Sequence, residues 1–152
     1  MKLAEALQER ADLKNRLEQI SIRIRNNALV QEGEQPAENP AALLGEYNDC
    51  IARFEELVAA INRTNSQTVV PGDTRTLTDL IAHRDALKIK IDDYRSFLND
   101  GSRIAPRASR SEIRILGTLD IPALQKTLDA LSRDLRLTEN KIQETNWTVD
   151  LL

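Results

Sequence analysis

Apolar residues recur at alternating spacings of three and four positions along four separate stretches of the chain. This spacing places them on one side of an α-helix. We therefore expect long helices near residues 2–27, 40–65, 76–98 and 120–147. The period is near 3.5, which favours left-handed, coiled-coil-like packing. The predicted fold class is mainly α: an antiparallel bundle of four long helices with a small β element in the connections, forming a single domain over residues 1–152.

The second stretch has the most continuous stripe, and we expect it to be the most buried helix. Asn39 is a good N-cap, and Pro40 suits the first helical position. The expected stripe consists of Leu44, Tyr47, Ile51, Phe54, Val58 and Ile61, and Leu43, Cys50 and Leu57 widen it.

One segment has the period of a strand instead of a helix. Ile113 and Ile115 alternate with Glu112 and Arg114, which is the pattern of a half-buried strand. A single short strand needs a partner. The candidates are residues 68–70, residues 28–30, or the same segment of another subunit.

The fourth stretch changes character along its length. Its stripe is apolar up to Leu135, but from Thr138 onward the inward positions include polar residues, namely Thr138, Glu139, Thr145 and Asn146. Polar groups enter a packed core only when they find hydrogen-bonding partners. Partners on the other stretches are therefore expected.

An up-down-up-down order of helices would bring polar residues of all four stretches to the same end of the bundle. The candidate site residues are Arg10, Asn62, Arg63, Asn65, Arg84, Asp85, Glu139, Gln143 and Asn146. Two interpretations remain open. The cluster is either a buried polar network that fixes the helix register, or a pocket in which arginines and amides bind a small anion or another small polar ligand.

Composition limits the classes of partner. The net charge is -3 and aromatic residues make up 3% of the chain, so neither a strong basic field nor a base-stacking surface is expected, which argues against nucleic acid. Cys50 is the only cysteine, and we expect it to be a buried apolar residue. The first residues contain no apolar stretch of a signal peptide, and no segment is apolar over the length of a membrane span. These features predict a cytoplasmic protein that acts without a membrane.

Evidence for enzyme chemistry is sparse. Glu55-Glu56 and Asp92-Asp93 are similar to the acidic pairs of all-α nucleotide pyrophosphohydrolases that bind magnesium, but the ordered set of carboxylates on facing helices is missing. His83 lacks a second ligand at suitable spacing in the sequence. The sequence indicates no catalytic residue, no metal ligand and no cofactor.

Several segments together carry a family resemblance. They are residues 1–7, 9–13, 26–33, 61–65, 109–113 and 143–147. Over nearly its whole length the chain resembles a family of uncharacterised bacterial cytoplasmic proteins described as septicolysin-like. The resemblance implies a helical protein without an established activity, and it supplies no catalytic residue.

Three functions therefore remain as hypotheses. Long apolar stripes and an unpaired strand favour a structural or interaction protein that forms a homo-oligomer. The alternative is a binder of a small polar or anionic ligand at the polar end of the bundle. The third is a magnesium-dependent nucleotide pyrophosphohydrolase.

Overall fold

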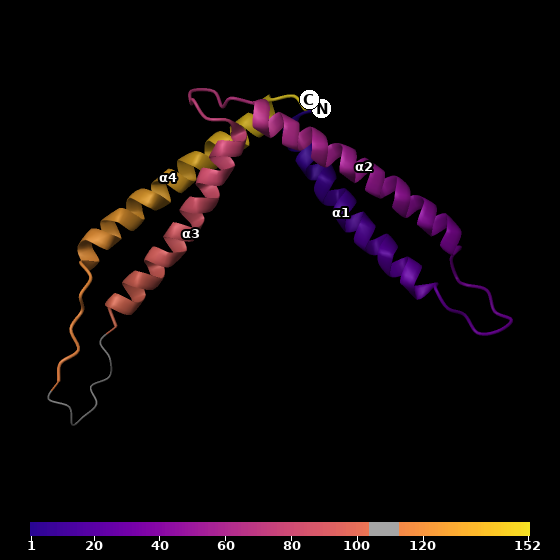
Figure 1. The fold of residues 1–152 in the computed structure, drawn as a ribbon, viewed down its shortest axis with the longest axis horizontal. Coiled ribbons are helices and arrows are strands. Elements are labelled where there is room, and N and C mark those ends of the chain that lie inside the picture. Colours follow the sequence, from indigo (N-terminus) through magenta and orange to yellow (C-terminus); the bar gives the residue numbers. More distant parts are fainter. Residues whose placement is uncertain (104–112) are drawn as a thin grey trace. The chain divides into compact units, whose positions relative to one another are not determined.

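Four long helices make up most of the protein. A computed structural model describes residues 1–103 and 113–152. The helices are α1 (Leu3–Asn26), α2 (Pro40–Gln67), α3 (Leu77–Gly101) and α4 (Ile121–Thr148), shown in Figure 1. The prediction of a mainly α fold with four long helices is confirmed, and each boundary lies within three residues of the predicted one.

The described chain divides into two compact units. Unit 1 comprises residues 1–76 and 143–152, and unit 2 comprises residues 77–142. In unit 1, α1 runs antiparallel to α2; in unit 2, α3 pairs with α4 (Figure 1). That the whole chain acts as one domain stays a prediction.

Local chemistry explains where the helices begin. The Asn39 side chain accepts a hydrogen bond from the backbone N–H of Ala41, and Pro40 occupies the first position of α2. At the start of α1, the Glu5 carboxylate accepts a hydrogen bond from the Lys2 backbone N–H at 2.7 Å. Gly72 has a φ of 73°, which the turn between α2 and α3 requires and which glycine adopts without strain.

The core of unit 1 is a narrow seam between α1 and α2. Its buried members are Leu3, Ala6, Ile20, Leu43, Cys50, Leu57, Ala60, Ile61 and Thr64. The predicted burial of Cys50 is confirmed. We expected the apolar stripe of α2 to be buried. This is wrong in part, because Leu44 is 48% exposed and Ile51 is 39% exposed.

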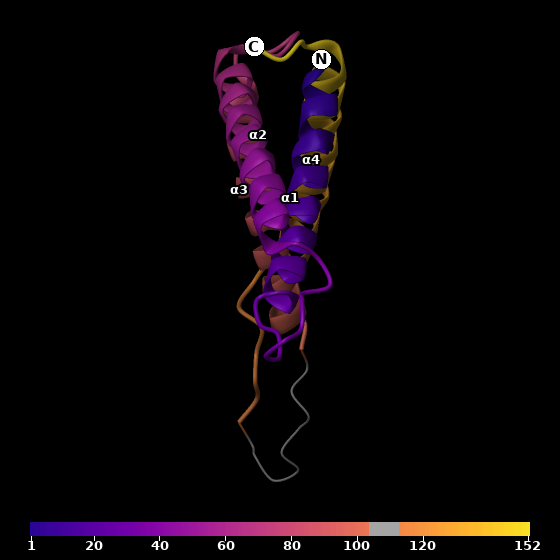
Figure 2. The same ribbon diagram turned by 90° about the vertical axis from the view of Figure 1, so that its right-hand side faces the viewer.

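The two chain termini close one end of unit 1. The Leu3 N–H donates to the carbonyl of Val149 at 2.9 Å, and the Leu151 N–H donates to the carbonyl of Met1 at 2.9 Å. The Lys2 ammonium lies 2.9 Å from the Asp150 carboxylate. Figure 2 shows this end opposite to the connection between α1 and α2. We call residues 1–3 with residues 149–152 the terminal clasp.

The core of unit 2 is a similar seam between α3 and α4. Its buried members are Leu77, Leu80, Leu87 and Ile91 of α3 with Leu128, Thr138 and Ile142 of α4. The four α3 residues follow one another at helical spacings, so they share one side of that helix. Of the four polar residues predicted to turn inward on α4, Thr138, Thr145 and Asn146 are buried, whereas Glu139 is only half-buried.

The small β element lies elsewhere than expected. Residues 113–118 have no regular secondary structure, and Ile113 and Ile115 are 83% and 78% exposed, so the predicted strand is wrong. Alternation over so few residues is a weak signal for a strand. The β pairing found in the described residues consists of two isolated bridges, Lys2 with Asp150 and Val69 with Thr76. Residue 112 of the predicted strand lies outside the described residues.

No helix of the described residues is long and apolar enough to cross a membrane.

Candidate functional site

Three ion pairs lie along α1 at regular intervals; two join it to α2, and the third joins it to the connection just before α2. The Arg53 Nε lies 2.7 Å from the Glu9 Oε1, and the Arg16 Nη2 lies 2.7 Å from the Glu46 Oε1. The third pair joins Arg23 to Glu38, with the Arg23 Nε 3.0 Å from the Glu38 Oε2. The α1 members are seven residues apart, and their partners Arg53, Glu46 and Glu38 follow in the reverse order along the chain. We call these three pairs the ladder; its order defines an antiparallel register.

The ladder changes the acidity of its three arginines and of Glu38. The hydrogen bond from Arg23 lowers the pKa of the Glu38 carboxyl below its ordinary value. The matching hydrogen bonds raise the pKa of Arg16, Arg23 and Arg53. All six side chains are partly solvated, so the ladder contributes little to overall stability. Its main effect is on the register in which α1 packs against its partner.

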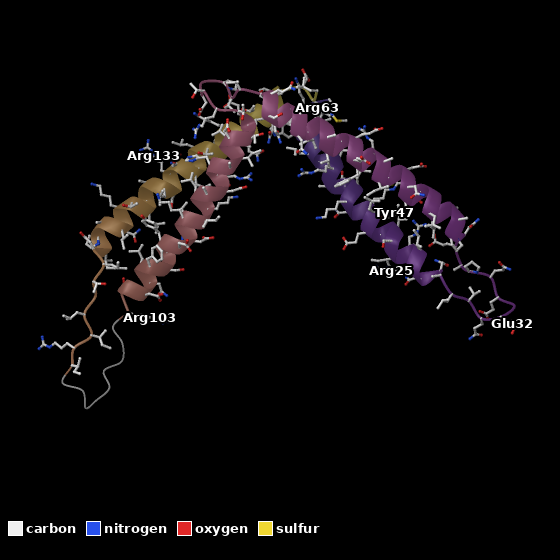
Figure 3. All side chains as sticks on the ribbon, viewed as in Figure 1. Arg25, Glu32, Tyr47, Arg63, Arg103 and Arg133 are labelled. Carbon is white, nitrogen blue, oxygen red and sulfur yellow. The ribbon has the colours of Figure 1, made fainter. Side chains whose placement is uncertain are left out.

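A second apolar stripe runs along α2 beside the buried one. Its members are Leu44, Tyr47, Ile51, Phe54 and Val58, all exposed or half-buried. Leu44, Ile51 and Val58 directly follow the buried Leu43, Cys50 and Leu57, so the second stripe lies about 100° around the helix from the first. Figure 3 labels Tyr47 on this part of α2. We call these five residues the α2 outer stripe; it is the candidate interaction surface.

A groove of about 420 Å³ lies between α3 and α4. Its lining contains Ile91 and Leu135 with Ser132, Lys88, Arg95, Arg136, Asp92 and Glu139. Lys88 pairs with Glu139 at 3.1 Å, and Arg95 pairs with Asp92 at 3.4 Å. Arg136 forms no ion pair with any residue that the structure describes. The groove is therefore lined by two apolar side chains and by one guanidinium that has no ion-pair partner among the described residues.

His83 is less isolated than its sequence neighbours suggest. Its Nε2 lies 3.1 Å from the Asp134 Oδ2, and the Thr138 hydroxyl donates to the Asp134 Oδ1 at 3.3 Å. The fold brings these three residues together from α3 and α4. Thr138 is buried while His83 is half-buried, so the arrangement connects the core of unit 2 to its surface.

The nine predicted site residues differ in burial. Asn146 is buried, Asn65, Arg84 and Glu139 are half-buried, and the exposed members are Arg10, Asn62, Arg63, Asp85 and Gln143. Five of the nine are therefore exposed, and the choice between a polar network and a ligand pocket stays a prediction. The physical reason for this exposure is that each helix of a two-helix unit covers only one side of its partner. The role of the nine in ligand binding stays a prediction.

The structure brings some of the nine into contact with other groups. The Arg84 guanidinium lies 2.7 Å from the carboxylate of Asp85, its neighbour in the sequence. Arg63 lies at the end of α2 next to the chain terminus (Figure 3), and its Nη2 donates to the Leu152 carbonyl at 3.5 Å. Arg84, Asp85 and Glu139 belong to unit 2, whereas the other six belong to unit 1.

Sequence reasoning missed the ladder, the groove and the terminal clasp. The ladder had a detectable signal, because Glu9, Arg16 and Arg23 recur every seven residues. The groove and the terminal clasp had no detectable signal in the sequence, because their members come from positions that are far apart in the sequence. Within the described parts of the chain, no group of three or more His, Cys, Asp or Glu side chains is placed to hold a metal ion.

Comparison with known proteins gives the family. The model described as "Family of unknown function (DUF6847)" matches residues 10–151. The chain belongs to this family. The match spans the α2 outer stripe, the α3–α4 groove and all of the ladder except Glu9, so these features lie almost entirely within the DUF6847 region.

A solved structure supports the fold of this DUF6847 protein. It is described as "Crystal structure of a functionally unknown conserved protein from Corynebacterium diphtheriae", and it is 37% identical in sequence with a TM-score of 0.87. The alignment covers 100% of this chain and 99% of that chain. Among curated proteins, none matches the chain. Neither finding bears on the septicolysin-like family, so that resemblance stays a prediction.

Proposed function

We propose that this DUF6847 protein is a structural or interaction protein that acts as a homo-oligomer in the bacterial cytoplasm. The α2 outer stripe carries the proposal. Its five apolar residues follow heptad-like spacing on a helix whose other apolar side is already buried against α1. A helix with two adjacent apolar sides is typical of bundles, in which each helix contacts two neighbours. The same residues would be costly to leave in water.

The stripe is apolar enough to matter for association. Burying apolar surface contributes about 25 cal/mol per Å². Leu44 and Ile51 are 48% and 39% exposed, and Tyr47 and Phe54 add aromatic area beside them. Aromatic residues are enriched at the centres of protein interfaces, whereas charged residues are depleted there. The α2 outer stripe contains no charged residue.

Sedimentation velocity of the purified protein at micromolar concentration tests this function. We expect a species heavier than the 17.1 kDa chain. Leu44→Glu should shift the distribution towards the single chain, because it places a charge in the interface. Ile22→Glu is the matched control, since Ile22 is a similarly exposed apolar residue on α1. A wild-type protein that sediments only as a 17.1 kDa species would overturn the proposal.

The second candidate function is binding of a small organic anion in the groove between α3 and α4. The Arg136 guanidinium and the apolar pair Ile91 and Leu135 line the same groove, which favours a carboxylate or phosphate with an apolar body. The acidic members of the groove already pair with Lys88 and Arg95, which reduces repulsion of an anion.

A thermal-shift screen tests the groove. Phosphate, sulfate, nucleotides and small carboxylates are the probes, and a bound anion raises the melting temperature by mass action. We expect Arg136→Ala to lose the shift and Arg133→Ala to keep it. Arg133 is an exposed arginine of α4 that does not line the groove. An equal shift in both variants, or none in the wild type, would remove this candidate.

A further inference from the structure

Four residues from each helix of unit 2 line the groove between α3 and α4, and both sets have spacings of three, one and three positions. They are Lys88, Ile91, Asp92 and Arg95 of α3 with Ser132, Leu135, Arg136 and Glu139 of α4. The two helices run antiparallel (Figure 1), so Lys88 and Glu139 lie at one end of the groove, and Arg95 and Ser132 lie at the other. The remaining four residues lie between these ends.

The groove carries one positive charge that its own carboxylates do not balance. Its cations are Lys88, Arg95 and Arg136, and its carboxylates are Asp92 and Glu139. Lys88 lies 3.1 Å from the Glu139 carboxylate, and Arg95 lies 3.4 Å from the Asp92 carboxylate. Arg136 has no ion pair within the part of the chain that the structure describes. A ligand with one negative charge therefore balances the charge of the groove.

A second negative charge on the ligand meets a less favourable environment. The other two cations are already engaged, so a group that approaches Arg95 also approaches the carboxylate of Asp92. Like charges at such short range repel each other, and this repulsion is one way in which a site rejects the wrong ligand. The arrangement disfavours dicarboxylates and the dianionic form of a phosphate monoester.

The rest of the lining suits an aliphatic chain. Ile91 is buried and Leu135 is half-buried, and no aromatic side chain is present among the eight lining residues for stacking on a base. A guanidinium binds a carboxylate through two parallel hydrogen bonds. We propose that the groove binds an aliphatic monocarboxylate, with its carboxylate on Arg136 and its chain along Ile91 and Leu135, and that Asp92 excludes dianions. This inference rests on the second candidate function and specifies its ligand.

Six-carbon probes that differ only in their end groups test the ligand class. Hexanoate carries one negative charge, adipate carries two, and hexan-1-ol carries none. Two-dimensional NMR of the full ¹⁵N-labelled chain, at neutral pH and constant ionic strength, follows each titration. We expect hexanoate to shift the amide signals of residues 88–95 and 132–139 and to bind about tenfold more tightly than either other probe. Affinity should rise from acetate to hexanoate by at most about fourfold for each methylene, the factor for full burial.

Four variants locate the charges that select the ligand. Arg136→Gln should weaken hexanoate binding about tenfold. Arg133→Gln is its matched control, since Arg133 is an exposed arginine of α4 outside the groove (Figure 3). Asp92→Asn should raise the affinity for adipate to that for hexanoate. Asp93→Asn makes the same change in net charge at an exposed residue outside the groove, so it should keep the preference for hexanoate.

The outcomes separate this inference from the function on which it rests. Phosphate or adipate that binds the wild-type groove as tightly as hexanoate would overturn the monocarboxylate and leave anion binding intact. Equal effects of Asp92→Asn and Asp93→Asn would overturn the role of Asp92. Hexan-1-ol that binds as tightly as hexanoate would show an apolar site and overturn the inference. Groove signals that respond to no anion would remove both the inference and the second candidate function.

Discussion

Arg16 of α1 and Glu46 of α2 form an ion pair, with the Arg16 Nη2 2.7 Å from the Glu46 Oε1. The pair lies at the centre of the ladder, between Glu9–Arg53 and Arg23–Glu38. Reversing the order of charges along one helix would place like charges opposite each other. The order of the charges therefore favours the antiparallel direction of α1 and α2.

Charge reversal in the ladder should weaken the fold, and a second reversal should restore it. We expect Arg16→Glu to lower the melting temperature, because it places two carboxylates side by side. The double variant Arg16→Glu with Glu46→Arg should recover most of the loss. Thermal unfolding at low and high salt measures both effects, and the difference between variants should shrink at high salt as screening increases. A double variant no more stable than Arg16→Glu would contradict a direct interaction.

Stability should depend on pH through Glu38. Its pKa is lowered in the folded protein from the ordinary 4.5 by the hydrogen bond from Arg23. A carboxyl group with a lowered folded pKa contributes stability above its unfolded pKa and loses that contribution as the pH falls through the folded pKa. We therefore expect Glu38→Gln to be less stable than wild type at neutral pH, and the difference to disappear at acidic pH. Urea unfolding across this range measures it, and a difference that is independent of pH would contradict the assignment.

One buried hydroxyl group of α2 accepts a hydrogen bond from the terminal clasp. The Thr64 Oγ1 donates to the Ala60 carbonyl at 2.9 Å and accepts from the Leu152 N–H at 3.0 Å. Thr64→Val keeps the shape but leaves the Leu152 N–H without its acceptor, which should cost about 1–3 kcal/mol in the free energy of unfolding. Thr64→Ser is the control and should keep most of the stability. Chemical denaturation measures both, and equal stability of Thr64→Val and wild type would show that water replaces the hydroxyl.

The two apolar stripes of α2 should respond differently to truncation. Leu57 is 1% exposed, and Leu57→Ala should cost about 2–5 kcal/mol in the free energy of unfolding. Leu44→Ala should cost much less in the single chain, because half of the side chain is already in water. Denaturation at concentrations low enough to keep the chain monomeric separates the two. A larger loss for Leu44→Ala would mean that the outer stripe is part of the core.

Arg84 distinguishes a structural polar group from a ligand-binding one. Its side chain is 29% exposed and its partner Asp85 is 57% exposed, so the pair is largely solvated. Exposed ion pairs contribute about 0–1 kcal/mol, so Arg84→Ala should change the melting temperature little. If Arg84 binds an anion, the same variant should lose the thermal stabilisation that phosphate, sulfate or a carboxylate gives to wild type. A large loss of stability without any ligand would instead support a structural network.

Local pattern determined the secondary structure of this protein. The spacing of three and four places apolar residues on one side of each helix, and Asn39 with Pro40 marks the start of α2, so four helices follow from the sequence alone. The burial of Thr138, Thr145 and Asn146 also follows from the local pattern, because these residues continue the stripe of α4. The strand predicted at Ile113 and Ile115 is not formed, because alternation of a few residues gives only a weak local signal and strand pairing is not a local property.

Tertiary structure decided which of two neighbouring stripes is buried and which polar groups meet. On α2, Leu43 and Leu44 belong to two stripes that are only one residue apart, and both stripes fit helical periodicity. Leu43 is the buried one because α1 packs against its side of the helix. Arg16 and Glu46 are thirty residues apart, and Thr64 and Leu152 are eighty-eight apart. Such contacts depend on how whole helices pack, because periodicity sets each residue's direction on its own helix but not the neighbour that it faces.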